Sequence, residues 1–307
     1  MTRATNLPSV AVLLSTYNGE KYVRSQIESI LSQEEVSIHI YARDDESTDS
    51  TLKILESFPS ELLTIYQGKN IGPKNSFFEL LNSCSGDHDY FSFSDQDDVW
   101  LKSKCARAVG HIKNNTECSL YCSVLSIVDE NLNSMGDVIF RRSGRIFPSI
   151  IFQNVASGNT SVFNKRALNV LREHPAPEEA IMHDWWAALL IYSCGGNIVY
   201  DTRPCIFYRQ HSENVLGMSL KRRIDTKALR NRIDQSLSQL DALMRTNSSW
   251  ADVNEYDKAL AILDSRESLL KRLIVLLRGL IKGRTLYSSI GLSLAYLVFG
   301  GKNKGIQ

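Results

Sequence analysis

Three carboxylates occupy four positions in the segment SDQDDVW, namely Asp95, Asp97 and Asp98. They follow the apolar run YFSFS (90–94) and come just before Trp100. Carboxylates this close repel one another, so one is protonated near neutral pH unless a cation lies between them. Mg²⁺ or Mn²⁺ removes that cost, and Mg²⁺ takes further oxygens from substrate phosphates. The cluster therefore predicts a metal and nucleotide-diphosphate site; the alternative is a solvated loop or a helix cap.

A second acidic loop, RDDESTDST (43–51), follows another apolar run. Asp44 and Asp45 lie where that run ends, and a carboxylate there can accept the N3–H of a uracil or thymine ring. This favours pyrimidine over purine nucleotides. Ser47 or Asp49 can instead cap a helix that begins a few residues later.

Two single residues are further candidates. Asp184 lies at the start of a predicted helix, in the segment HDWW, where its alternative role is an N-cap or a first-turn charge that stabilises the helix. His211, in RQH, follows the apolar segment CIFY, and its alternative role is a hydrogen bond at a strand end. Trp185 and Trp186 are either core residues or, for one of them, part of an acceptor cleft.

The elements that must position these residues alternate between strand and helix over the first hundred positions. This alternation predicts a parallel sheet covered by helices on both faces. In such sheets ligands bind beyond the carboxyl ends of the strands, where the loops STYNGE, RDDESTD and SDQDD should converge. The expected strands are 10–14, 37–42, 63–67 and 90–94, and the expected helices are 21–32, 51–58 and 75–84.

The rest of the chain continues with mixed elements and then changes character. We expect a helix at 102–113, a strand at 119–129, a strand and helix within 157–168, a helix at 182–196, and strands in NIVYD and CIFYRQH. From about Leu220 the sequence becomes rich in Leu and Arg with helical spacing. We therefore divide the chain into a catalytic domain (1–220) and a C-terminal helical region (221–307).

Seven segments between residues 8 and 217 together resemble family 2 glycosyltransferases, and they occur in that family's order. They are VAVLLSTYNGEKYVRSQIESILSQ, RDDESTDST, NIGPKNSF, FSDQDDVW, SGNTSVFNK, HDWW and YRQHSENVLG. The forms DQDDVW and RQHSENV resemble the branch of rhamnosyltransferases. The resemblance implies the GT-A nucleotide-sugar-binding fold, a Rossmann-like mixed α/β sheet flanked by helices, here with a C-terminal helical extension.

The resemblance also implies roles for matching residues. Thr16, Tyr17 and Glu20 would border the base and ribose of the nucleotide, and Asp44 or Asp45 would bind the pyrimidine. Asp95, Asp97 and Asp98 would form the metal and diphosphate site, and His211 would reach the metal or diphosphate. Asp184 would be the general base. Asp97 or Asp98 would be the direct metal ligand. The usual Glu-Asp pair is His183–Asp184 here, and the usual DDGS is DDES.

Other residues are candidates for substrate contact, with structural roles as equal alternatives. Asn75 and Lys104 could contact ribose or phosphate. Gly158, Asn159 and Trp185 could shape the acceptor side of the site.

These assignments imply an inverting, metal-dependent glycosyltransferase. It would move rhamnose or a hexose from a UDP- or dTDP-sugar to a surface polysaccharide or a lipid-linked glycan. One alternative is a sugar nucleotidyltransferase, although STYNGEKY lacks the Gly-rich loop expected of that class. Another is a non-catalytic binding module, which would not need Asp184 beside an intact acidic cluster.

Composition limits the partners. The chain of 307 residues has a net charge of +1, which gives no general attraction for nucleic acid. Its six cysteines form no CxxC pair, which is typical of a reducing compartment. We find no signal peptide or spanning helix, and expect a cytoplasmic protein at the inner face of the membrane.

The C-terminal tail carries a separate signal. Residues 268–307 contain seven cations and no acidic residue. One expected helical face consists of Leu269, Leu273, Leu276, Leu277 and Leu280. An apolar face beside cations predicts peripheral contact with an anionic membrane through these basic helices. The alternatives are packing on the catalytic domain or a homodimer interface.

Overall fold

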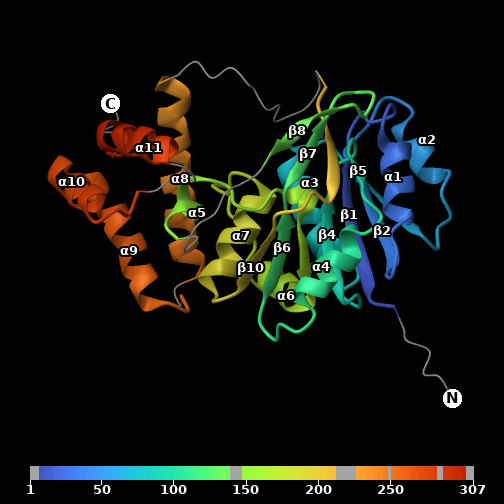
Figure 1. The fold of residues 1–307 in the computed structure, drawn as a ribbon, viewed down its shortest axis with the longest axis horizontal. Coiled ribbons are helices and arrows are strands. Elements are labelled where there is room, and N and C mark those ends of the chain that lie inside the picture. The colour runs from blue at the N-terminus through green and yellow to red at the C-terminus, as the bar shows by residue number, and fades with distance from the viewer. Residues whose placement is uncertain (1–6, 139–146, 212–225, 248–249, 282–285, 302–307) are drawn as a thin grey trace.

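A computed structural model describes residues 7–138, 147–211, 226–247, 250–281 and 286–301 (Figure 1). Its main sheet has seven strands in the order β10-β6-β9-β4-β1-β2-β3. Strand β1 is parallel to β2 and β4, whereas β9 runs antiparallel between β4 and β6. The strands are β1 (Ser9–Thr16), β2 (Ser37–Asp44), β3 (Leu63–Gln67), β4 (Tyr90–Ser94), β6 (Ser119–Ser123), β9 (Val162–Asn164) and β10 (Asn197–Asp201).

Both faces of this sheet are buried, as the continuous apolar runs predict. In β1, Val10 and Val12 join a hydrophobic cluster on one face, and Ala11 and Leu13 join a second cluster on the other. This alternation follows from the two-residue period of a strand. The predicted layered α/β architecture is confirmed, and the antiparallel β9 makes the sheet mixed. The covering helices are α1 (Val23–Leu31), α2 (Thr51–Glu56), α3 (Gly72–Ser83), α4 (Lys104–Ile112), α6 (Lys165–Glu173) and α7 (His183–Ser193).

A second sheet of four strands has the order β5-β11-β7-β8. It comprises β5 (Val99–Trp100), β7 (Leu125–Val128), β8 (Ser134–Val138) and β11 (Ile206–Arg209). The expectation of one strand over 119–129 is wrong, because the chain leaves the main sheet at Val124. Residues before Val124 pair with β10, and residues after it pair with β11. The small sheet thereby brings the end of β11 beside the acidic cluster.

The C-terminal helices lie at the end of the molecule opposite α1 and α2 (Figure 1). They are α8 (Thr226–Thr246), α9 (Val253–Asp264), α10 (Leu269–Leu277) and α11 (Leu286–Phe299). The expected boundary at 220 falls outside the described residues. Ile233 and Tyr296 belong to the same hydrophobic cluster as Leu13 and Trp186 of the catalytic part. Among the described helices, none combines the length and apolar character needed to cross a bilayer.

Candidate active site

The carboxyl ends of β1 and β2 meet at Thr16 and Asp44. The Thr16 hydroxyl donates to Asp44 Oδ1 at 3.3 Å, and Ser47 donates to Asp44 through its hydroxyl (2.6 Å) and its backbone N–H (3.0 Å). Both Thr16 and Asp44 are buried. Asp44 thus fixes the turn that follows β2.

Asp45 fixes a different loop. It forms an ion pair with Arg43 and accepts the backbone N–H groups of Ile71 (3.1 Å) and Gly72 (2.9 Å). Gly72 begins α3 and has a φ of 77°, in the left-handed region that favours glycine. Asp45 therefore holds the start of α3 against the end of β2.

Gln96, inside the acidic segment, connects the loops after β1 and β4. Its side-chain oxygen accepts the Tyr17 N–H at 2.8 Å, and its side-chain nitrogen donates to the Tyr17 carbonyl at 2.9 Å. A Cβ at Gly19 would lie 2.3 Å from Gln96 Oε1, so a side chain there would displace Gln96 from this contact. The Tyr17 ring stays exposed beside the pair. Sequence reasoning missed Gln96, whose one signal was its place between Asp95 and Asp97.

Asp97 and His211 come together although 114 residues separate them. Asp97 Oδ2 lies 2.8 Å from His211 Nε2, and the Arg209 side chain donates to the Asp97 carbonyl at 2.9 Å. The His211 ring packs against Tyr22 with centroids 4.9 Å apart. Sequence reasoning missed Arg209 and Tyr22; Arg209 begins the RQH motif that was singled out for its histidine.

Asp98 is fully buried, whereas its neighbour Asp97 is not. Its Oδ2 accepts the Asn159 side-chain amide at 2.7 Å, and its Oδ1 accepts the Arg209 backbone N–H at 3.3 Å. Burial, followed by repulsion from Asp97 and Asp95, raises the pKa of Asp98 well above its usual range. Asp98 accordingly connects the acidic segment to the loop around Asn159.

Asp95 interacts electrostatically both with the acidic cluster and with Asp184. Burial raises its pKa to about 7, and the charges of Asp97 and Asp184 add to this shift while Lys104 opposes it. Lys104 is itself completely buried, where its ammonium donates to the Asn159 carbonyl at 2.8 Å and lies 3.0 Å from the centre of the Trp100 ring. Burial lowers the pKa of Lys104 to about 8. Lys104 is therefore an internal countercharge rather than a surface group.

Asp184 lies in the first turn of α7, and Met182 caps that helix. Its Oδ2 accepts the Gly158 N–H (2.8 Å) and the Asn154 side-chain amide (2.7 Å). Its Oδ1 accepts the Trp185 N–H at 2.7 Å. Sequence reasoning missed Asn154. The segment 154–160 consequently contacts Asp184 at one end and, through Asn159, Asp98 at the other.

Three predicted residues have partners away from these contacts. Glu20 accepts the Ser50 N–H at 2.8 Å, and the Asn75 side chain donates to the carbonyl of Ile71 in its own helix region. The indole N–H of Trp185 donates to the Ile150 carbonyl at 2.6 Å. Trp185 and Trp186 are both buried, so neither indole lines an open surface.

The residues present fit a divalent ion only with help from a substrate. Within the described ranges, no group of three or more His, Cys, Asp or Glu side chains is arranged to hold a metal. Asp97 and His211 offer one oxygen and one nitrogen within 2.8 Å of each other. Mg²⁺ in proteins is commonly held by one or two carboxylates together with waters and substrate phosphates. An ion at Asp97 and His211 would have to take its remaining ligands from water and substrate phosphate.

Comparison with protein families decides the class of the chain. The model described as Glycosyl transferase family 2 matches residues 11–172, more than half of the sequence. This chain belongs to glycosyltransferase family 2. The predicted family and enzyme class are confirmed, and the family membership argues against the nucleotidyltransferase and the non-catalytic module.

Relatives of this glycosyltransferase support the same class. The "dTDP-rhamnosyl transferase RfbG" of Shigella flexneri is 28% identical over 232 residues, which cover 70% of this chain and 78% of RfbG. An uncharacterized glycosyltransferase of Haemophilus influenzae is 26% identical and covers 85% of this chain and 84% of its own.

Two solved structures share the fold of this glycosyltransferase. TarS of S. aureus, in complex with UDP-GlcNAc, has a TM-score of 0.57 at 19% identity and covers 84% of this chain and 72% of its own. The mannosyltransferase PcManGT of Pyrobaculum calidifontis, in complex with GDP-Man and Mn²⁺, has a TM-score of 0.54 at 16% identity. The match covers 98% of this chain and 89% of the PcManGT chain. These similarities confirm the predicted GT-A fold.

Proposed function

We propose that this family 2 enzyme is an inverting, metal-dependent glycosyltransferase that moves rhamnose or a hexose from a UDP- or dTDP-sugar to a glycan. The observation that carries this proposal is the segment 154–160, which contacts Asp184 through Gly158 and Asp98 through Asn159. A base for the acceptor and an acidic site for the donor diphosphate are thereby held by one short segment.

Asp184 is the proposed general base. Two N–H donors bind its Oδ2, whereas its Oδ1 accepts only the Trp185 N–H within the described part of the chain. Oδ1 thus has a lone pair for the proton of an acceptor hydroxyl. Direct displacement by that hydroxyl inverts the anomeric carbon and needs no second carboxylate nucleophile, in contrast to the paired carboxylates of retaining hydrolases.

Asp97 and His211 are the proposed ligands of Mn²⁺ or Mg²⁺, and Asp98 supports them from the interior. The bound ion supplies charge neutralisation for the leaving diphosphate. Asp95, half-buried beside Asp97, would face the ribose or diphosphate. We assign Thr16, Tyr17, Asp44 and Asp45 to the base-binding edge, either as contacts or as supports for its loops.

The identity of the donor is inferred from relatives. The name of RfbG specifies a dTDP-rhamnosyl donor, and RfbG matches 70% of this chain. The fold neighbours bind UDP-GlcNAc and GDP-Man. A dTDP- or UDP-sugar agrees with a carboxylate at the end of β2, where a carboxylate could accept the N3–H of a pyrimidine.

The proposed acceptor is a surface polysaccharide or lipid-linked glycan, and the proposed location is the cytoplasmic face of the cell membrane. Peripheral contact with the bilayer through the C-terminal basic helices would place the enzyme beside such an acceptor. No contact with nucleic acid is proposed.

The test compares Asp184→Asn with Asp97→Asn. In an assay of nucleotide release from dTDP-rhamnose and UDP-sugars with Mn²⁺, both variants should lose at least about a thousandfold in turnover, the scale of removing a base or a metal ligand. By calorimetry, only Asp97→Asn should bind donor much more weakly. Asp257→Asn, an exposed change on α9, is the matched control and should behave as the wild type. Near-normal turnover of Asp184→Asn would refute the base assignment, and tight donor binding by Asp97→Asn without metal would refute the metal assignment.

A further inference from the structure

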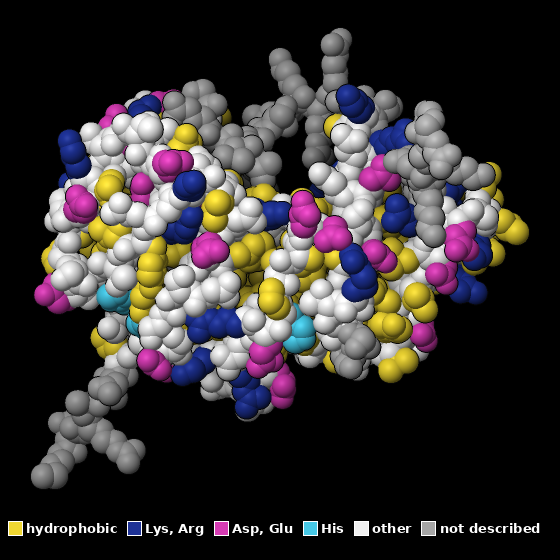
Figure 2. Space-filling view, turned by 180° about the vertical axis from the view of Figure 1, so that it is seen from behind, with side chains coloured by type: hydrophobic (Ala, Val, Ile, Leu, Met, Phe, Trp, Pro, Cys, Tyr) yellow, Lys and Arg dark blue, Asp and Glu magenta, His cyan; other side chains and the backbone are white. Residues whose placement is uncertain are grey.

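The helix α10 carries an exposed row of large apolar side chains, here named the α10 stripe. Their exposed fractions run from 39% to 87%. Within the nine residues of α10, only Val275 is buried. The stripe consists of Leu269, Leu270, Leu273, Ile274 and Leu277. Positions four residues apart share a helix face, so these side chains form one continuous ridge. Figure 2 shows hydrophobic side chains at the end of the molecule that α10 forms.

This stripe corrects the face expected from the sequence. Leu280 is buried and Leu276 is half-buried, whereas Leu270 and Ile274 are exposed. The helix ends at Leu277, and Gly279 has a φ of 65°. That left-handed residue ends the helical path, so Leu280 turns into the core instead of continuing the ridge.

The charge around the stripe is positive. Residues 268–307 hold seven cations and no acidic residue. Lys271 and Arg278 are both exposed, within and just after α10. Lys271 pairs with Glu267 at 2.7 Å, and an exposed pair of this kind contributes little to stability. Lys282, Arg284, Lys302 and Lys304 lie outside the described residues.

We propose that the α10 stripe inserts into the boundary between headgroups and acyl chains of an anionic bilayer. This proposal deepens the peripheral membrane contact proposed above and depends on neither the sugar nor the catalytic residues. Anionic lipid complements the exposed cations Lys271 and Arg278, because such a surface attracts basic side chains. Leucine and isoleucine ridges partition into this boundary as interfacial helices do.

The composition of the stripe favours lipid over a protein partner. The energetic centres of protein interfaces are rich in Trp, Tyr and Arg and poor in Leu, and they seat such residues in matching pockets. The stripe has only Leu and Ile on a convex helix surface. Lipid tails adapt to such a ridge without a preformed groove.

The test measures binding of the full chain to vesicles by sedimentation. The variant carries Leu273→Glu and Leu277→Glu, and the matched control carries Leu7→Glu, an exposed leucine (54%) at the other end of the molecule. Vesicles contain equal parts phosphatidylglycerol and phosphatidylcholine, or phosphatidylcholine alone. We expect the wild type to bind the anionic vesicles, and this binding should weaken at high salt. The double variant should bind them about tenfold or more weaker, whereas the control should bind them as the wild type does. Thermal melts of all three proteins verify that they fold.

Several outcomes would overturn the proposal. Insertion of the stripe is excluded if the wild type does not bind anionic vesicles. It is also excluded if the double variant binds them as the wild type does. Sedimentation equilibrium without lipid tests a second copy as the occupant. A wild-type dimer that the double variant loses, without vesicle binding by either, would assign the stripe to a homodimer interface. Since nucleotide release is assayed without vesicles, failure of membrane binding stays distinguishable from failure of the proposed reaction.

Discussion

At the scale of single residues, His183 and Asp184 are neighbours in opposite environments. Asp184 accepts three N–H donors, whereas neither ring nitrogen of His183 has a hydrogen-bond partner within the described residues. The His183 ring stacks on Phe77 at 3.8 Å and meets the edge of Phe93 at 4.7 Å. Burial lowers the pKa of His183 to about 4, against a small opposing effect of Asp184. His183 therefore acts as a neutral aromatic support beside Asp184, the proposed base.

This environment predicts a specific dependence of stability on pH. In the unfolded chain the pKa of His183 is about 6.5, whereas in the folded chain His183 binds a proton only near pH 4. Stability is thus lost as pH falls from 6.5 towards 4, and His183 should account for about 2 kcal/mol between pH 7.5 and pH 5. His183→Phe fills the same slot without titrating. Urea unfolding of both proteins at the two pH values should show the smaller loss in the variant, and parallel losses would contradict the prediction.

Sequence reasoning proposed candidate residues for the site but did not predict their contacts. The order of motifs identified Asp97, Asp184 and His211 as candidates, because polar loops after strands must converge. It could not reveal that Asp98 faces the interior or that Lys104 is a buried countercharge. Those facts depend on the path of segment 154–160, which no local pattern specifies.

At the scale of elements, segment 154–160 contacts both Asp184, the proposed base, and Asp98 of the acidic cluster. Gly158 is the tightest point, since an added Cβ would lie 2.8 Å from His183 Nε2 and 3.2 Å from Asp184 Cβ. Gly158→Ala should therefore displace Asp184 and lower kcat by about tenfold to a hundredfold, as small misplacements of catalytic groups do. Donor affinity should stay within about threefold, because the contact between Asp97 and His211 lies outside this segment.

A matched substitution separates this effect from the loss of glycine in general. Gly110 lies inside α4, and an added Cβ there would meet nothing within 4 Å. Gly110→Ala should leave kcat unchanged and stabilise the helix by about 0.5–1 kcal/mol. Steady-state kinetics and urea unfolding of both variants provide the comparison. Equal kcat in Gly158→Ala and the wild type would show that the segment does not position the base.

The elements themselves were largely predictable from periodicity, with failures where tertiary pairing decides. The first four strands and three helices follow from apolar runs and helical spacing. The split between β6 and β7 at Val124 was missed because both halves are apolar and only their partners, β10 and β11, differ. The two-residue β5 is too short to give a pattern and exists only through its pairing with β11.

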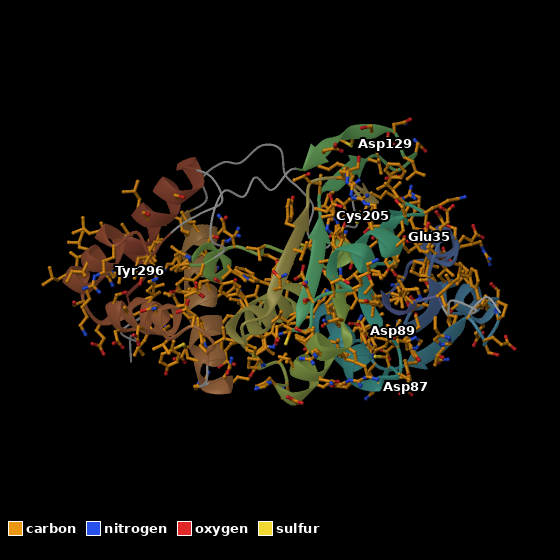
Figure 3. The ribbon with its side chains drawn as sticks, turned by 60° about the horizontal axis from the view of Figure 1, so that its bottom comes forward. Glu35, Asp87, Asp89, Asp129, Cys205 and Tyr296 are labelled. Carbon is orange, nitrogen blue, oxygen red and sulfur yellow. The ribbon has the colours of Figure 1, made fainter. Side chains whose placement is uncertain are left out.

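At the scale of the whole molecule, the C-terminal helices share the core of the catalytic part. Figure 3 labels Tyr296 among these helices, far from Glu35 on the sheet side. The Tyr296 ring lies 5.9 Å from that of Phe152 in α5 (Ser149–Phe152), and its hydroxyl donates to the Ile262 carbonyl at 2.9 Å. Gln239 of α8 accepts the Ile181 N–H at 2.8 Å, two residues before α7 begins. The helical region therefore supports the elements around Asp184, the proposed base.

This shared core predicts that residues 1–220 alone do not form a stable domain. Four side chains of α8 are completely or almost completely buried, namely Ile233, Leu237, Leu240 and Leu243. Burying one such side chain contributes about 1.5–3 kcal/mol, so the four contribute on the order of 6–12 kcal/mol. That is similar to the whole free energy of unfolding of a typical domain, about 5–15 kcal/mol.

A chain that ends at residue 220 should accordingly bind a hydrophobic dye, lose its near-ultraviolet circular dichroism and show no cooperative urea transition. A chain that ends at residue 301 is the control and should unfold as the full chain does, because it retains all four core residues of α8 together with Tyr296. A cooperative transition of the shorter chain, with most of the full-length stability, would instead make the helical region an independent domain. In that case α8 would cover the catalytic part without stabilising it, and its hydrogen bond to Ile181 would contribute nothing to the free energy of unfolding.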